Sequence, residues 1–212
     1  MLTLDTLEQA CKVYLVDEME QDSAHDLAHL GRVVHQSKKL ALQEGADVLI
    51  VAAAAWLHDL VNYPKDDPKR VQASFDSATK AEPFLKRQGF DSADICAIQH
   101  AIVTHSYSAQ VTPRTLEAKV VQDADRLDAL GAIGIARCMM VGGRLDRSLY
   151  EALDPFCRER EPNDLLYTVD HFYKKLLSLE STFQTLSGRK EAQRRSQFMR
   201  TFLDQLASEI SE

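Results

Sequence analysis

The amino-acid sequence predicts an all-α fold, built as a single-domain helical bundle. Apolar residues recur at helical spacing along the whole chain, and no stretch shows the strict alternation of a half-buried strand. Capping residues divide this pattern into helix-sized pieces, with Asp or Ser before several of them and Gly after them. The 212 residues, 45% of them hydrophobic and 27% charged, are enough for a full core without disulfides.

The expected helices follow in order along the chain. The first lies where Leu4, Leu7 and Cys11 share one face. The others are expected from a cap at Asp22 or Ser23 to about Glu44, over 48–60, 71–88, 92–106 and 117–140, from Pro162 and Asn163 onward, and over 187–210. The stretch 48–60, VLIVAAAAWLHDL, is apolar on every side, so we expect it at the buried centre of the fold.

The chain shows no sign of a second domain. It contains no internal repeat, no low-complexity tract and no linker composition, so residues 1–212 are expected to form one domain. The segment from Gly142 to Pro162 has no clear periodicity and is expected to be a long loop.

Charge and cysteine usage narrow the range of partners. The net charge of −7 argues against a nucleic-acid binder and against a basic membrane-surface helix. The acidic N-terminal stretch lacks the basic flank of a signal peptide, and the longest apolar run, Val48–Leu57, is too short to span a bilayer. The four cysteines show no CxxC spacing and are expected to be reduced thiols. We therefore expect a cytoplasmic protein that binds neither nucleic acid nor membrane.

Three polar patches interrupt the apolar pattern. The first, AHDLAHLGRV at 24–33, places His25 and His29 one helical turn apart. The second is the pair His58–Asp59 at the end of the apolar helix. The third, VVQDADRLDALGA at 120–132, carries Asp125 among apolar neighbours on the side expected to face inward.

The His58–Asp59 pair indicates a metal site. A single buried histidine is most often structural and hydrogen-bonded, but an unpaired buried carboxylate beside it is costly. A divalent metal satisfies both groups, and a further histidine with the Asp125 carboxylate would complete an open octahedral site with room for water and substrate. Imidazole and carboxylate ligands admit manganese, magnesium, iron, cobalt, nickel or zinc.

The same residues resemble the signature of a known family. The order His29, then His58–Asp59, then Asp125 is similar to the H…HD…D motif of the HD-domain metal-dependent phosphohydrolases. The flanking residues agree as well, with HDxxHxxRV at 25–33, LHD at 57–59 and DADRLD at 123–128. The resemblance covers about 23–140, the expected metal-site core, onto which the helices of 163–210 would pack. The segment HFYKKLLSL at 171–179 is similar to a bacterial subgroup.

The resemblance implies a cofactor and an activity. The cofactor would be a divalent metal, with manganese expected first, and its ligands would be His29, His58, Asp59 and Asp125. The small bacterial members of the family are described as nucleotide pyrophosphohydrolases or phosphohydrolases. The implied reaction is therefore hydrolysis of a phosphoanhydride or phosphoester bond, for example of a nucleoside triphosphate to monophosphate and pyrophosphate.

Two other functions stay open at this point. One is a nucleotide-binding sensor with little turnover, and the other is a nucleoside monophosphatase. Asn62 stands where some HD nucleotidases carry an acidic residue, which argues against the monophosphatase. The expected partner in every case is a small anionic phosphorylated molecule such as a nucleotide. The amphipathic last helix fits either packing within the chain or a homodimer.

Further residues are candidates for catalysis and substrate binding. Asp59 is expected to orient the attacking water as well as to bind the metal. His25 is expected to act as general acid, by analogy with related phosphodiesterases, or else to cap or pack its helix. The candidates for substrate binding are Arg32, Lys65, His100 and His105. The two histidines could equally bind a second metal or be structural, and the two cations could be solvated charges.

Overall fold

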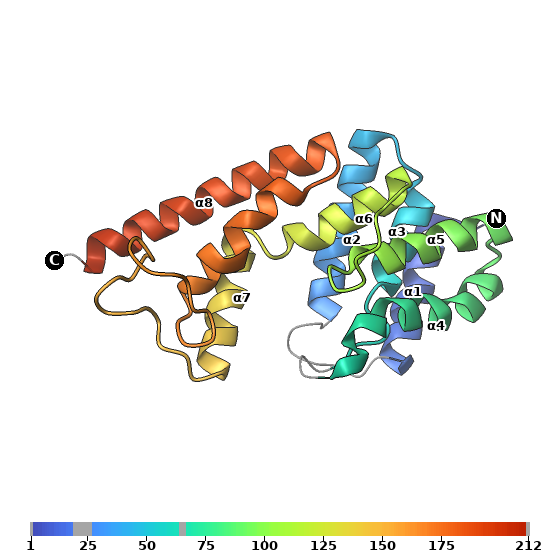
Figure 1. Ribbon diagram of the computed structural model, residues 1–212. Helices are drawn as coiled ribbons and strands as arrows, with labels where there is room; N and C mark the ends of the chain where they lie inside the picture. The colour runs from blue at the N-terminus through green and yellow to red at the C-terminus, as the bar shows by residue number, and fades with distance from the viewer. Residues whose placement is uncertain (1, 19–26, 64–66, 211–212) are drawn as a thin grey trace. The chain divides into compact units, whose positions relative to one another are not determined.

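The fold of the described residues is helical throughout. The computed structural model describes residues 2–18, 27–63 and 67–210 (Figure 1). These ranges contain helices and short helical turns but no strand, and their isolated β-bridge pairs Ser148 with Tyr167. The prediction of an all-α fold is confirmed. Within the same ranges, no helix has the length and apolar character needed to cross a membrane.

The elements keep the order in which the sequence predicts helices. They are α1 (Leu4–Glu18), α2 (Leu27–Glu44), α3 (Val48–Leu57), η1 (Pro68–Gln72), α4 (Ala73–Gln88), α5 (Ser92–His105), α6 (Leu116–Leu127), α7 (Gly131–Arg144), η2 (Phe172–Leu176), η3 (Leu177–Thr182) and α8 (Leu186–Ile210). The expected cap of the second helix, at Asp22 or Ser23, lies outside the described residues.

The chain divides into two compact units. The first runs up to Asp125 and includes Gln184–Ser187, and the second comprises Arg126–Phe183 and the residues from Gly188 onward. Asp125 therefore belongs to the first unit, together with the candidate ligands His29, His58 and Asp59. The expectation of one domain over 1–212, with helices of 163–210 packed on a core of 23–140, stays a prediction.

Helix α3 lies at the centre of the first unit. It begins at a cap where the Leu49 and Ile50 N–H groups donate to Asp47 Oδ1, over 2.8 and 3.2 Å. Every residue from Val51 to Leu57 is buried, which fits a helix that packs against α1, α2 and α5 (Figure 1). Burial of each large aliphatic side chain stabilises the fold by about 1.5–3 kcal/mol. The expectation of a buried central helix is confirmed.

Glycines and an aspartate set the ends of the helices around α3. α2 ends before Gly45 and α4 ends before Gly89, and both glycines have a left-handed backbone, with φ of 78° and 89°. That conformation costs glycine little and lets the last carbonyl groups of the helix find donors. α5 begins at Asp91, whose carboxylate accepts from the Ala93 and Asp94 N–H groups. These three boundaries agree with the sequence-based expectation.

The second unit differs from the expectation at two glycines. The single helix expected over 117–140 is broken, because α6 ends at Leu127 and α7 begins at Gly131, which has a φ of 70°. The loop expected from Gly142 also starts later, because α7 continues through Gly142 and Gly143 to Arg144. A Cβ on Gly142 would lie 2.2 Å from the Thr168 hydroxyl oxygen. Gly142 thus allows close packing inside the helix and does not end it.

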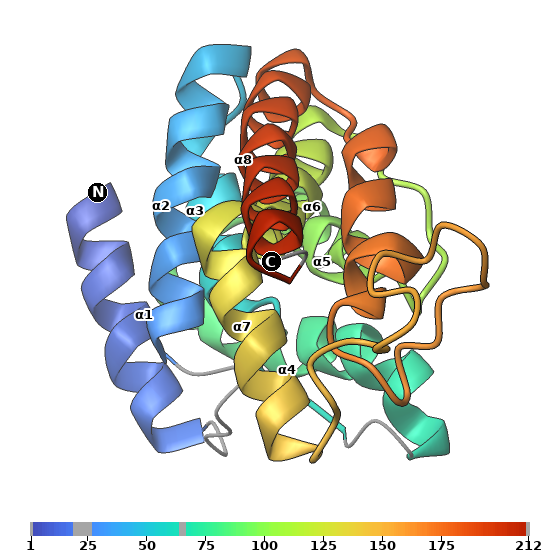
Figure 2. The ribbon, with the colours of Figure 1, turned by 90° about the vertical axis from the view of Figure 1, so that its left-hand side faces the viewer.

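The segment between α7 and η2 is an irregular loop, as expected (Figure 2). The helix expected at Pro162 and Asn163 does not form there, and helical turns start only at Phe172. Asp170 explains this difference, because its carboxylate accepts from the Asn163 N–H group over 2.6 Å and from the Arg160 guanidinium. These bonds hold the chain in a turn where a helix would have begun.

Candidate metal centre

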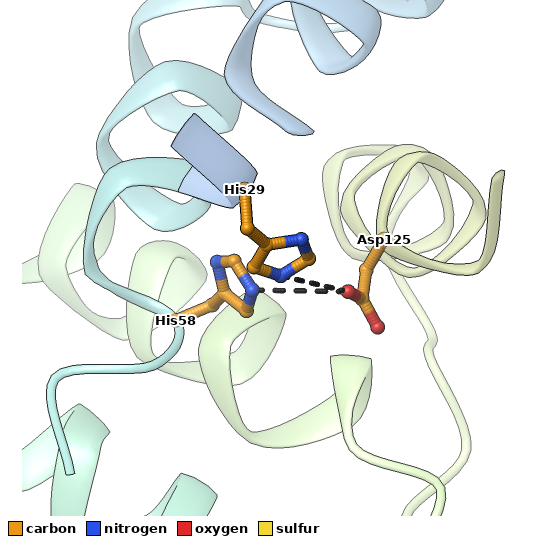
Figure 3. A group of neighbouring side chains, drawn as sticks. All are labelled: His29, His58 and Asp125. Atoms are coloured by element: carbon orange, nitrogen blue, oxygen red, sulfur yellow. Dashed lines mark ion pairs between the residues drawn. The ribbon is translucent and has the colours of Figure 1, made fainter. Parts of the chain in front are cut away.

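Three helices bring the four candidate ligands together. His29 lies in the first turn of α2, His58 and Asp59 directly follow α3, and Asp125 lies near the end of α6. α2 packs against α3, which fixes the two histidines relative to each other. Figure 3 shows both imidazole rings directed toward the Asp125 carboxylate. The structure therefore brings together four residues that are up to 96 positions apart in the sequence (29 to 125).

The spacing of the ligand atoms suits a shared cation. His58 Nε2 lies 3.4 Å from Asp59 Oδ2 and 3.8 Å from Asp125 Oδ1. His29 Nε2 lies 3.7 Å from Asp59 Oδ2 and 3.6 Å from Asp125 Oδ1. Ligand atoms about 2.1 Å from one ion lie roughly 3.0–3.4 Å apart in octahedral or tetrahedral geometry. The observed separations are slightly wider, so small side-chain rotations would close them around an ion.

Backbone hydrogen bonds determine which nitrogen of two histidines faces inward. His58 Nδ1 pairs with the Ala55 carbonyl oxygen over 2.8 Å, and His105 Nδ1 pairs with the Ile102 carbonyl oxygen over 2.6 Å. A carbonyl can only accept, so each Nδ1 carries a proton and each ring turns its Nε2 atom toward the centre. In the part of the chain that the structure describes, the buried His58 Nε2 has no hydrogen-bond partner. A bound cation would take the place of a proton at this atom.

The carboxylates dominate the electrostatics of the centre. Burial by itself lowers the pKa of His58, but the adjacent Asp59 carboxylate and Asp125 raise that pKa to about 9. Burial raises the pKa of Asp59, but His58 and His105 outweigh it and hold the pKa well below its usual range. Two ionised carboxylates therefore create a field at Nε2 that favours positive charge, which a divalent cation would supply.

One side of the centre is open to solvent. The side chains of His29 and His58 are 3% and 0% exposed, whereas those of Asp59 and Asp125 are 16% and 28% exposed. The imidazoles therefore form the buried wall of the centre and the carboxylates form its rim.

His105 belongs to this centre as closely as the expected ligands do. Its Nε2 atom lies 3.5 Å from Asp59 Oδ1, and its ring meets that of His58 edge-on with centroids 4.6 Å apart. The groups His29, His58 and Asp125, and His58, Asp59 and His105, each have ligand atoms near enough to hold a metal. The sequence could have indicated that His105 points inward, because it follows the buried residues Ile98 and Ile102 at helical spacing.

The three aspartates of the DADRLD stretch have different partners. Asp123 is fully buried and accepts from the Gln184 N–H group and from the N–H and hydroxyl groups of Thr185. Asp128 is also buried and pairs with Arg137. Of these three aspartates, only Asp125 faces the histidines. The sequence analysis also expected Asp125 to face inward. The other two are structural.

The turn after the HD pair is tied to α4. The Val61 N–H group donates to the Ser77 hydroxyl over 3.0 Å, and that hydroxyl donates to the Val61 carbonyl over 3.3 Å. The Tyr63 hydroxyl donates to Asp76 over 2.8 Å. These bonds hold the chain in place just beyond Asp59, and nothing in the sequence indicated them.

The remaining candidates lie in different surroundings. Arg32 is half-buried on α2, one turn beyond His29. His100 accepts a hydrogen bond from the Arg114 N–H group over 3.0 Å, and burial, with Arg114, lowers its pKa. His25 and Lys65 lie outside the described residues.

Fold and site together define a class of protein. It is an all-helical protein with a half-buried cluster of imidazoles and carboxylates that could hold a divalent metal. The donor set fits a divalent cation, because it combines imidazole nitrogens with carboxylate oxygens and includes the His58 Nε2 atom, which has no hydrogen-bond partner among the described residues.

Comparisons with known proteins identify the family. Residues 26–130 match the HD domain family. The uncharacterized protein YpgQ of Bacillus subtilis (strain 168) is 32% identical over 195 residues, which cover 90% of this chain and 87% of YpgQ. The chain therefore belongs to the HD-domain phosphohydrolase superfamily.

Solved structures agree with this assignment. The crystal structure of Bacillus subtilis YpgQ in complex with ADP is similar with a TM-score of 0.76 and 31% identity, covering 99% of this chain and 97% of that one. The crystal structure of an HD-superfamily hydrolase from Bacillus thuringiensis has a TM-score of 0.75 and 30% identity, covering 97% of this chain and 96% of that one.

Proposed function

We propose that this protein is a metal-dependent phosphohydrolase that cleaves a phosphoanhydride or phosphoester bond of a nucleotide. The reaction that fits best is hydrolysis of a nucleoside triphosphate to a monophosphate and pyrophosphate. The observation that carries the proposal is the convergence of His29, His58, Asp59 and Asp125 in a chain of the HD superfamily. A nucleotide substrate is supported by the ADP bound to the YpgQ relative.

The proposed ligands are His29, His58, Asp59 and Asp125, with manganese expected first. A divalent cation at this position supplies Lewis acidity and makes a bound water more acidic. The protein supplies the fixed orientation of the donors, since His58 is held by the Ala55 carbonyl and Asp59 lies between His58 and His105. Asp59 is further proposed to orient the attacking water, because its carboxylate is the partly exposed group nearest the buried imidazoles.

Four more residues are proposed to bind the substrate: Arg32, Lys65, His100 and His105. Arg32 shares a face of α2 with His29, which supports a role for its guanidinium in binding a phosphate at the same centre. His105 contacts Asp59 and would meet substrate only beside that carboxylate. His25 is proposed as general acid for the leaving oxygen, from its position one turn before His29.

A nucleotide sensor is the second candidate. The ADP complex of the YpgQ relative supports nucleotide binding, and binding by itself requires no turnover. Against this reading, His29, His58, Asp59 and Asp125, the four positions of the family motif, are all filled in this chain. The monophosphatase is disfavoured by Asn62, an exposed amide that cannot serve as a base.

A product analysis tests the proposal. Metal-stripped protein is resupplied with manganese, magnesium, cobalt or nickel and incubated with nucleoside mono-, di- and triphosphates. Pyrophosphate released from triphosphates supports the pyrophosphohydrolase, and orthophosphate released from monophosphates moves the assignment to a nucleotidase. If the protein binds nucleotide but releases no product with any of the metals, the nucleotide-sensor hypothesis would replace the phosphohydrolase.

A further inference from the structure

A buried glutamine connects the helices that carry Asp125 and His105. Gln122 lies on α6 three residues before Asp125, so the two side chains share one face of the helix. Gln122 Nε2 donates to the backbone carbonyl oxygen of Thr104 over 2.6 Å. Thr104 directly precedes His105, the last residue of α5. One hydrogen bond thus joins α6 to the last turn of α5, within the first unit.

This hydrogen bond is shielded from water. Gln122 is 3% exposed and Thr104 is 0% exposed, and the Thr104 hydroxyl donates to the His100 carbonyl over 2.8 Å. A hydrogen bond in such a dry environment meets no competition from solvent and is electrostatically strong. It can therefore hold the two helices at a defined separation.

The second polar atom of the same amide is left without a partner. Among the described residues, none forms a hydrogen bond with the buried Gln122 Oε1. An unsatisfied buried polar atom costs about 1–3 kcal/mol, and glutamine bears that cost at Oε1 while its Nε2 satisfies the Thr104 carbonyl. Packing alone therefore does not account for glutamine at this position.

We propose that Gln122 is a positioning residue that sets the place of Asp125 relative to the imidazoles, and thereby the metal affinity of the centre. The proposal rests on the metal-dependent function proposed above. His29, His58 and His105 are placed by direct packing of α3 against α2 and α5. Asp125 comes from a separate helix, α6, and Gln122 on the same helix face ties that helix to α5.

The required precision explains why one bond matters. Asp125 Oδ1 lies 3.6 Å from His29 Nε2 and 3.8 Å from His58 Nε2. Metal and catalytic sites tolerate errors of only about 0.5 Å in the placement of their groups. A small displacement of α6 would take Asp125 out of range of a cation held by the histidines.

The test compares two glutamine-to-methionine variants of the full chain. Gln122→Met removes the proposed tether. Gln99→Met is the matched control, because Gln99 Nε2 also donates to a backbone carbonyl of a neighbouring helix, that of Ala78 on α4, over 3.1 Å. The dissociation constant for Mn²⁺ is measured on metal-stripped protein by electron paramagnetic resonance of free Mn²⁺, and the stability of the metal-free protein by urea unfolding.

The expected results separate positioning from stability. Gln122→Met should raise the Mn²⁺ dissociation constant by roughly 10–100-fold, the usual effect of removing a group that orients a ligand. The urea midpoint should change little, because the variant leaves the Thr104 carbonyl without its donor but also removes the unpaired Oε1 atom. Gln99→Met should leave the dissociation constant within about twofold of wild type. At saturating metal, the KM for nucleotide should stay unchanged in Gln122→Met, because the buried side chain touches no substrate.

Three outcomes would overturn the proposal. The first is wild-type Mn²⁺ affinity in Gln122→Met, or in Gln122→Leu should the methionine variant fail to fold. The second is an equal loss of affinity in both methionine variants. The third is wild-type protein that binds no Mn²⁺, which would also remove the proposed function. Wild-type protein that binds Mn²⁺ but cleaves no nucleotide would refute the proposed function alone, since the affinity comparison would still decide the role of Gln122.

Discussion

The Oδ1 atom of Asp59 lies 3.5 Å from His105 Nε2, while its Oδ2 atom lies 3.4 Å from His58 Nε2. The carboxylate thus stands between two buried imidazoles, each fixed by a hydrogen bond from Nδ1 to a backbone carbonyl three residues earlier. The two groups of side chains that could hold a cation share His58, the residue directly before Asp59. His58 and Asp59 are adjacent in the sequence, but His105 is added only by the packing of α5 on α3.

Replacement of this carboxylate should abolish metal retention and hydrolysis together. Asp59→Ala is expected to lower Mn²⁺ affinity by roughly 100-fold or more and to remove nucleotide hydrolysis, while the far-ultraviolet circular dichroism stays helical. Asp204→Ala, which removes an exposed carboxylate on α8, is the matched control and should behave as wild type. Full activity in Asp59→Ala would show that the ligand assignment is wrong.

Two aspartates separated by a single residue should respond in opposite ways. Asp123→Ala removes the acceptor of three buried hydrogen bonds and should lower the free energy of unfolding by about 2–4 kcal/mol. Asp125→Ala should lower the stability of the metal-free protein much less, because its side chain is 28% exposed and lies at the rim of the centre, but should abolish activity. Urea unfolding and nucleotide hydrolysis, measured on both variants, check this contrast. Equal destabilisation of the two variants would contradict it.

The loop between α7 and η2 should depend on one buried ion pair. Asp170 is fully buried and binds both terminal nitrogens of Arg160 and the Asn163 N–H group. Removal of one partner from such a pair costs about 3–5 kcal/mol. Asp170→Asn should therefore unfold at lower urea concentration and be cleaved faster by protease within 145–171. Arg160→Lys should resemble it, since lysine cannot bind a carboxylate through two parallel bonds. Unchanged protease cleavage in both variants would refute the assignment.

The pH dependence of stability should include a contribution from Glu191. Hydrogen bonds from the Arg194 guanidinium, with Arg195 beside it, lower the pKa of Glu191 from 4.5 to about 2. Because the folded-state pKa is depressed, the contribution is fully present above pH 4.5 and is lost as the pH falls toward 2.

Glu191→Gln provides the measurement. At pH 7 the variant should be less stable than wild type, by about 1 kcal/mol or less because the pair is partly solvated. The difference should shrink as the pH is lowered from 5 to 3 in urea unfolding experiments (about the range over which the carboxylate titrates). A difference that stays constant over this range would exclude Glu191 ionisation as its source.

The sequence predicted the features that depend on local chemistry. The starts of α3 and α5, and the ends of α2 and α4, follow from helical periodicity and from caps such as Asp47, Asp91 and Gly89, because these signals act within a few residues. The helix expected over 48–60 ends earlier, at Leu57. The burial of α3 followed from its uniform apolar composition. His58, Asp59 and Asp125 were candidates because buried polar residues in apolar helices require a partner, and the resemblance to the HD family added His29. Their role as ligands stays a prediction.

Only the tertiary structure decided how distant residues meet. The contact of His105 with Asp59 spans 46 positions, and the bonds of Asp123 to residues 184 and 185 span 61 and 62. Distant residues also meet where Gly142 packs closely against Thr168 and where Asp170 holds the turn at Asn163. A side chain's own neighbours in the chain determine its helix and its face. Which group lies opposite that face depends on the packing of whole helices, and therefore no local pattern could have predicted these contacts.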